Sequence, residues 1–130
     1  KKIYFWKRAQ ILISDIWGIF GGKNIGEFTD LDWLTAFADY KLPQILRHWD
    51  ILEYSKKLEA KIKNRVPVKA GSKEEIEIRS ATVWAVEYLK EEMNKLGHNL
   101  KSFEIDWFLW NKSKEKPLPK PHHLTKTYFY

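Results

Sequence analysis

The sequence contains no cysteine and only one methionine among its 130 residues. The lack of cysteine excludes a disulfide scaffold, a zinc site built on thiolates and a cysteine nucleophile. It also suits a reducing compartment, and we therefore expect the protein in the cytoplasm. No apolar run approaches the roughly 20 residues that a membrane-spanning helix needs, so no membrane partner is expected.

Metal and phosphate-loop chemistry find little support in the polar residues. His122 and His123 are adjacent, so their side chains diverge, whereas His48 and His98 are isolated. The stretch at residues 21–23 is rich in glycine but lacks the frame of a phosphate-binding loop, and no serine sits in a nucleophile elbow. We predict no metal and no cofactor, which leaves carboxylates as the groups able to do chemistry.

The composition is that of one globular domain, predicted to span residues 1–130, with 44% hydrophobic and 31% charged residues. The net charge of +6 is uneven, because residues 111–126 hold five lysines and one glutamate, or +4, and the remainder holds +2. Such a basic tail can bind phosphates but more often serves solubility. Nucleic acid is therefore not an expected partner.

Apolar residues recur at helical spacing through most of the chain, which predicts an all-α fold. A compact bundle of five or six helices is expected, over residues 3–20, 30–38, 43–49, 50–62, 72–96 and 103–110. Ser72 and Glu75 have capping-box spacing, as do Asp50 and Glu53. The extended tail from Pro117 ends in an aromatic cluster, so we expect it to dock back on the helices, with a short strand as one option.

One carboxylate lies where two of these helices meet. Asp39 comes shortly before Pro43, which favours the first turn of a new helix. Leu42 is expected to be extended because it precedes a proline. Asp39 is therefore either an N-cap that holds the junction together or a carboxylate with a chemical role.

Several carboxylates fall on or beside apolar helix faces, namely Asp15, Asp39, Glu77 and Asp106. Burying an ionised carboxylate is costly unless it is paired or hydrogen-bonded, and the candidate partners are Lys7, Arg8, Lys41 and Arg79. Structural ion pairs are one interpretation. The other is a carboxylate that stabilises an oxocarbenium-like centre and orients a water molecule, as in glycoside cleavage.

Three segments resemble the queuosine salvage protein family in order and spacing: residues 5–18 (FWKRAQILISDIWG), 37–46 (FADYKLPQIL) and 75–79 (EIEIR). Residues 52–55, 71–72 and 127–130 also match, so the resemblance covers nearly the whole chain. It implies an N-glycosidase that hydrolyses queuosine 5′-monophosphate and releases queuine for reuse in transfer RNA. It also implies a helical fold similar to that of helix-hairpin-helix DNA glycosylases.

The same resemblance implies roles for individual residues. The aspartate of the Phe-Ala-Asp-Tyr motif is the catalytic acid, and Asp39 occupies that position. The predicted substrate-binding residues are Lys7, which would contact the phosphate, with Arg8, Asp15, Phe37 and Tyr40. Two alternatives stay open: Lys7 and Arg8 could pair with Asp15 and brace the helix, and Phe37 could belong to the core. Glu77 and Arg79 are interpreted as structural.

Members of this family are considerably longer, and the chain resembles their C-terminal portion. An N-terminal segment or a second chain is therefore a possible partner. Two other functions remain alternatives. The first is a helical nucleic-acid-binding module like a DNA glycosylase, which the nearly balanced charge outside the tail disfavours. The second is a non-catalytic half that needs a partner chain.

Overall fold

The computed structural model describes residues 3–130, and helices are the regular secondary structure in that range. Its elements are α1 (Lys7–Phe20), η1 (Asn24–Gly26), η2 (Leu31–Trp33), α2 (Lys41–His48), α3 (Lys56–Lys63), α4 (Lys73–Lys95) and α5 (Ser102–Glu115). The predicted bundle of five or six helices is confirmed, with five α-helices in the described range. The likeness to DNA glycosylases stays a prediction.

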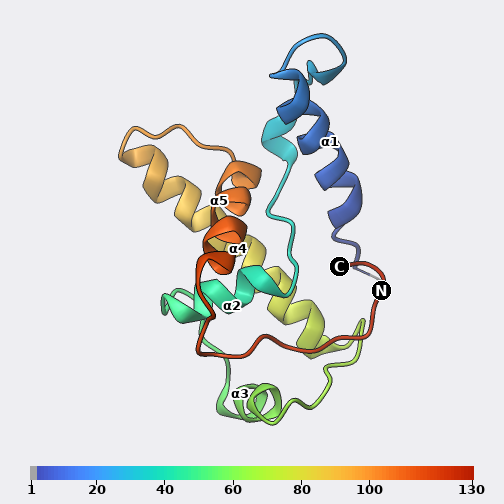
Figure 1. Ribbon diagram of the computed structural model, residues 1–130, viewed down its shortest axis with the longest axis vertical. Coiled ribbons are helices and arrows are strands. Elements are labelled where there is room, and N and C mark those ends of the chain that lie inside the picture. Colours follow the sequence, from blue (N-terminus) through green and yellow to red (C-terminus); the bar gives the residue numbers. More distant parts are fainter. Residues whose placement is uncertain (1–2) are drawn as a thin grey trace.

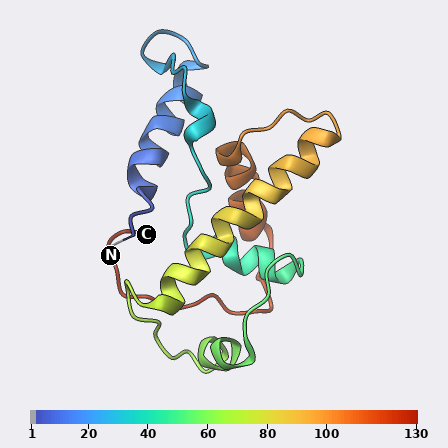
Figure 2. The same ribbon diagram turned by 180° about the vertical axis from the view of Figure 1, so that it is seen from behind.

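The helices α2, α4 and α5 form the centre of the fold, α1 stands to one side and α3 lies at one end (Figures 1 and 2). The largest apolar core lies between these three central helices. It contains Leu42 and Leu46 of α2, Val86 of α4, and Ile105 and Leu109 of α5, none of them more than 5% exposed. The C-terminal end of the chain lies beside the start of α1 (Figures 1 and 2).

A second apolar cluster joins α1 to α5. The rings of Trp17 and Phe103 meet edge to face with centroids 5.3 Å apart, and Trp107 packs on both. Gly18 makes this approach possible, because a Cβ there would lie 3.2 Å from the ring of Trp107. These three aromatic residues thus fix α1 against α5.

The predicted ends of α4 are confirmed. The Oγ of Ser72 accepts the backbone N–H of Glu75 at 3.3 Å, and Gly97 follows the helix at φ +89°, a conformation that suits glycine.

Ser72→Ala should lower the free energy of unfolding by about 1 kcal/mol, because one N–H of the first turn of α4 loses its acceptor. Ser80→Ala within the same helix is the control and should be neutral or slightly stabilising, since alanine is the best helix former. Urea unfolding of both variants measures the difference. Equal stability of the two would show that the cap contributes nothing.

Two predicted helices are wrong. The helix expected over residues 30–38 is limited to the single turn η2, after which the chain is extended up to Asp39. No helix begins at Asp50, which adopts φ +56° and pairs with Lys120 Nζ at 2.9 Å. Helix α3 begins instead after Ser55, whose Oγ accepts the N–H of Leu58 at 3.3 Å.

Other predicted boundaries also need correction. Helix α1 begins at Lys7 rather than residue 3, because Trp6 is left-handed at φ +49°. Leu42 is helical rather than extended, since Pro43 sits early in α2, where a missing N–H costs little. Helix α5 continues to Glu115, and at its start the Glu104 carboxylate accepts the N–H of Lys101 at 2.9 Å.

The tail docks back on the helices as predicted, although it forms no strand within the described range. The N–H of Val68 donates to the carbonyl of Leu124 at 2.7 Å. The side chain of Gln44 donates to the carbonyl of Lys120 at 2.8 Å, and that of Arg47 donates to the carbonyl of Pro121 at 3.2 Å. The tail therefore lies across α2 and the loop before α4 (Figure 1).

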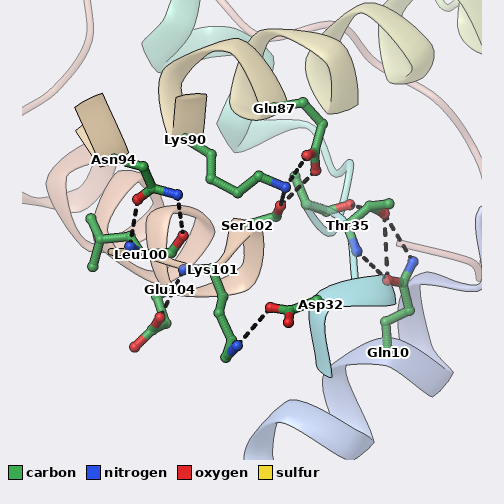
Figure 3. A network of polar contacts seen from close by, with 11 residues as sticks. Gln10, Asp32, Thr35, Glu87, Lys90, Asn94, Leu100, Lys101, Ser102 and Glu104 are labelled. Carbon is green, nitrogen blue, oxygen red and sulfur yellow. Dashed lines mark hydrogen bonds and ion pairs between the residues drawn. The ribbon is translucent and has the colours of Figure 1, made fainter. Parts of the chain in front are cut away.

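Polar side chains join η2 and α4 to the start of α5 (Figure 3). Lys101 Nζ pairs with Asp32 at 2.6 Å, which fixes η2 to the start of α5. The hydroxyl of Ser102 donates to Glu87 of α4 at 2.6 Å.

None of the described helices is both long and apolar enough to cross a lipid bilayer.

Candidate active site

The segment between η2 and α2, residues 34–40, carries the predicted catalytic residue. Its backbone forms neither helix nor strand from Leu34 to Asp39, Tyr40 has helical dihedral angles, and the side chains from Ala36 to Asp39 are each less than 9% exposed. An extended segment inside a helical protein has no neighbouring strand to bond, so its backbone groups need other partners. Side chains from three different helices supply them.

The first partner is Gln10 of α1. Its Oε1 accepts the N–H of Thr35 at 2.7 Å, and its Nε2 donates to the carbonyl of Phe5 at 2.9 Å (Figure 3). The second is Asp106 of α5, whose Oδ2 accepts the N–H of Phe37 at 2.6 Å. The third is Arg79 of α4, whose Nε donates to the carbonyl of Ala38 at 3.1 Å. The segment is thus fixed along its length, immediately before Asp39.

Asp39 itself holds the start of α2. Its Oδ1 accepts the N–H groups of Lys41 at 2.7 Å and Leu42 at 2.9 Å, so its side chain bonds the first turn of α2, although the N-cap position is Tyr40 rather than the predicted Asp39. Within residues 3–130 its Oδ2 makes no hydrogen bond and is not among the fully buried, unpartnered polar atoms. One oxygen is therefore fixed by the backbone, while the other is available to a water molecule or a ligand.

Burial dominates the electrostatics of this carboxylate. It raises the pKa of Asp39, and the two backbone N–H donors and the positive charge of Lys7 oppose that rise. Burial, with a smaller contribution from the charge of Asp39, raises the pKa of Asp106 to about 7 against the lowering effects of the Phe37 N–H and of Lys7. Asp39, Asp106 and Lys7 therefore form one interacting cluster at the junction of α1, α2 and α5.

Arg79 lies beside this cluster, because its side chain binds the carbonyl of Ala38, the residue before Asp39. Its guanidinium lies between two aromatic rings, 4.1 Å from the ring centre of Phe5 and 4.5 Å from that of Tyr130. It also pairs with Glu75 at 3.4 Å, and both side chains are less than 9% exposed. This one residue therefore joins α4, the segment before Asp39, the start of the chain and its last residue.

The predicted substrate-binding residues are not all brought together. The positive charge of Lys7 acts on both buried carboxylates and lowers their pKa values, whereas Arg8 and Asp15 are exposed on α1. No ion pair joins Lys7 or Arg8 to Asp15 among the pairs formed in residues 3–130. A role for Arg8 and Asp15 in substrate binding stays a prediction without support from their positions.

The two aromatic residues beside Asp39 differ in their surroundings. Phe37 is 4% exposed and packs with Leu31 and Phe103, so the geometry favours its core interpretation. Tyr40 is 39% exposed and meets the ring of His122 edge to face at 4.8 Å. Of the two, only Tyr40 is placed to contact a ligand.

The roles of Asp106, Arg79 and Gln10 at this site were not predicted from the sequence. Asp106 was recognisable as a carboxylate beside an apolar face, and Arg79 as the partner of Glu75. Their bonds to the backbone at residues 37 and 38 have no sequence signal. Within the described residues no group of three or more His, Asp or Glu side chains is placed to hold a metal ion.

His123 in the tail makes the docked state sensitive to acid. It is 2% exposed, its Nε2 lies 3.3 Å from the hydroxyl of Tyr130, and burial lowers its pKa to about 4. Because the folded protein favours the neutral ring, the stabilisation is present above pH 6.5 and is lost as the pH falls from 6.5 towards 4.

His123→Gln should therefore lose less stability than the unaltered chain between pH 7 and pH 5. The expected difference is on the order of 1–2 kcal/mol. The raised pKa values of the buried aspartates act equally in both proteins and cancel in the comparison. Denaturant unfolding at the two pH values measures it, and an identical pH response would show that His123 is not held neutral by folding.

Comparison with known proteins assigns the sequence of this chain to a family. The family model described as queuosine salvage protein matches residues 1–130. The chain belongs to the queuosine salvage protein family. The relative from Sphaerobacter thermophilus is 47% identical, that from Dictyostelium discoideum 46% and that from Mus musculus 37%, each over 100% of this chain.

All three relatives carry the name queuosine 5′-phosphate N-glycosylase/hydrolase. The chain spans about 41% of the length of each of them. The queuosine salvage family is thus the one that the sequence resemblance indicated.

Proposed function

We propose that this chain carries the catalytic centre for hydrolysis of the N-glycosidic bond of queuosine 5′-phosphate. The observation that carries the proposal is Asp39, a buried carboxylate with one oxygen fixed by two N–H groups and the other free. The name of the relatives, which are up to 47% identical, supplies the substrate.

The reaction suits a fixed carboxylate. As the bond between C1′ and the base nitrogen breaks, the bonding electrons leave with the base and positive charge develops on the ribose. A carboxylate held in advance stabilises that charge without reorganisation. The free Oδ2 of Asp39 can also accept a proton from the attacking water, while the departing base takes a proton from solvent. The products are queuine and ribose 5-phosphate.

A pKa raised by burial helps Asp39 to accept the proton of the attacking water. A general base works best when its pKa lies near the working pH, and burial moves the pKa of Asp39 upward in that direction. The backbone donors and Lys7 limit this rise, so the carboxylate can remain ionised before the reaction.

Lys7 is proposed to bind the 5′-phosphate, because it lies in the first turn of α1 and its positive charge acts on both carboxylates of the cluster. Lys7→Met should lower kcat/KM for the nucleotide by about 10–100-fold, the range of one charge-assisted contact of 1.5–3 kcal/mol. The loss should be smaller for the nucleoside queuosine, which has no phosphate. Steady-state kinetics with both substrates measures the effect.

Arg8→Met is the matched comparison, since Arg8 is the next residue and is exposed. An equal loss with both variants would mean that the overall charge of α1, rather than Lys7, assists the reaction. An equal loss with nucleotide and nucleoside would remove the phosphate assignment.

The function itself is tested by product analysis. The purified chain is incubated separately with queuosine 5′-monophosphate, queuosine and guanosine 5′-monophosphate, and the products are separated by chromatography. Equimolar queuine and ribose 5-phosphate from the first substrate, with no guanine from the third, is the expected result. Guanine release at a similar rate would show that the base is not recognised.

A second candidate is favoured by a surface that we call the aromatic face. It comprises five aromatic side chains that are each at least 60% exposed: Tyr4, Trp6, Trp33, Trp84 and Tyr88. Two open grooves run along it and share Trp84. Large exposed apolar surfaces of this kind mark interaction sites. Under this alternative a further segment or a second chain covers the face, and activity requires it.

Trp84→Ser with Tyr88→Ser separates the candidates. If the aromatic face binds a required partner, the substitutions should abolish copurification of that partner and the activity that depends on it. If the 130-residue chain is sufficient, its turnover should be unaffected. Neither groove includes Asp39 in its lining, so the substitutions leave the carboxylate cluster intact.

A further inference from the structure

Asp106 lies in the middle of α5 and is 3% exposed. The neighbouring positions on its helix, Phe103, Ile105 and Leu109, are at most 5% exposed. Its carboxylate forms no ion pair within residues 3–130, and its hydrogen bond is the one that Oδ2 accepts from the N–H of Phe37. A buried carboxylate with so little compensation is expensive for folding, so stability alone does not explain it.

Through its bond to the N–H of Phe37, Asp106 contacts the backbone two residues before Asp39, the proposed catalytic aspartate. The bond joins residues 69 positions apart in the chain. On the next residue, Arg79 binds the carbonyl of Ala38 from another helix. The backbone before Asp39 is thus held from α5 and from α4 together, which restricts the direction in which its carboxylate can point.

Asp106 also shares the electrostatic surroundings of Asp39. The groups that face this pair are Lys7 from α1, Lys41 from α2 and Arg79 from α4. The pKa of Asp106, raised to about 7 by burial, means that its charge changes in the physiological range. Ionisation of one carboxyl group then opposes ionisation of the other.

We propose that Asp106 is a positioning residue for Asp39: it holds the Phe37 amide so that the free oxygen of Asp39 faces the substrate, and its own ionisation changes the electrostatic surroundings of that oxygen. The inference rests on the proposed function for its catalytic part. Its structural part concerns the link between α5 and the segment before Asp39 and does not need activity.

Two variants separate the parts played by the acceptor and the charge. Asp106→Asn keeps an oxygen that can accept the N–H of Phe37 but removes the negative charge. Asp106→Leu keeps the branching at Cγ in a somewhat larger side chain and removes both. We expect Asp106→Leu to lower kcat by about 10²-fold, the cost of a misplaced reacting group, with little change in KM. The kcat of Asp106→Asn should be at least about tenfold higher than that of Asp106→Leu.

The pH profile supplies a readout that a purely structural residue would not move. In the unaltered chain kcat/KM should change with pH as both Asp39 and Asp106 titrate. In Asp106→Asn the pH profile should follow the titration of Asp39 alone. Equal kcat for the unaltered chain and both variants, or equal loss in both variants with an unchanged profile, would overturn the catalytic part.

Nuclear magnetic resonance tests the inference without turnover. The Phe37 amide proton should shift with pH in the unaltered chain, with a midpoint near the pKa of about 7 of Asp106, and lose that shift in Asp106→Asn. The Asp39 carboxyl carbon should show a second, smaller shift near the pKa of about 7 at which its neighbour Asp106 ionises, and Asp106→Asn should abolish that second shift. Asp30→Asn, at an exposed position, should change neither signal.

These results distinguish the two proposals. A Phe37 amide that does not titrate, or an Asp39 carboxyl that is unaffected by Asp106→Asn, overturns the inference whether or not queuine is released. Both signals behaving as expected, in a chain that hydrolyses nothing, would contradict the proposed function while the link through Asp106 stands.

Discussion

Asp39→Asn is expected to reduce kcat for queuine release by about 10³-fold or more, which corresponds to at least ~4 kcal/mol of lost transition-state stabilisation. The free Oδ2 becomes an amide that neither carries negative charge nor accepts a proton from water. Asparagine is as good an N-cap as aspartate, so the bonds to the N–H groups of Lys41 and Leu42 can be kept. The variant should therefore be folded and should still bind substrate.

Circular dichroism, thermal unfolding and calorimetric binding of queuosine 5′-monophosphate are measured beside the kinetics. Asp30→Asn makes the same chemical change at an exposed position just before η2 and should leave kcat unaltered. A folded Asp39→Asn variant with kcat within about threefold of the parent would remove Asp39 from the mechanism. Loss of folding in the variant would instead show that its cap is essential.

Arg79→Met should lower the free energy of unfolding by about 3–5 kcal/mol, the usual cost of removing one partner from a buried ion pair. Three interactions disappear together. Glu75 loses its counter-charge at a position 4% exposed, the carbonyl of Ala38 loses its donor, and the rings of Phe5 and Tyr130 lose the cation between them. Denaturant unfolding at pH 7 measures the loss.

Lys73→Met is the control on the same helix. Lys73 pairs with Glu77 at the same i,i+4 spacing, but the two side chains are 88% and 62% exposed. Its removal should change stability by no more than about 0.5 kcal/mol. Similar effects from both substitutions would show that burial does not decide how much these pairs stabilise the fold.

The parts of the fold that could be predicted are those whose signal is local. The cap at Ser72 and the left-handed Gly97 define α4 from residues next to its ends, and both are confirmed. Asp50 carries an equally good local signal and misled, because it is the left-handed residue after the end of α2, where the N–H of Ile51 donates back to the carbonyl of Leu46 at 2.9 Å. A capping pattern states a preference, and the end of the preceding helix can override it.

The site was predictable to a similar extent. Asp39 could be identified because a proline pattern and a family motif meet there. The extended run before it was predicted as helix, since its apolar residues have helical spacing. What overrides that spacing is the bonding of its backbone by Asp106 and Arg79, 69 and 41 positions away. Backbone groups have no side-chain pattern, so such contacts leave no trace in a single sequence.

Cleavage of a glycosidic bond by the carboxylate cluster of this chain is best tested by a single-turnover assay. The purified 130-residue chain is mixed in excess with queuosine 5′-monophosphate, the reaction is stopped at intervals, and queuine is quantified by chromatography. We expect the unaltered chain to release queuine to completion and Asp39→Asn to release none above the enzyme-free rate. Release at equal rates by the two proteins would contradict catalysis by Asp39.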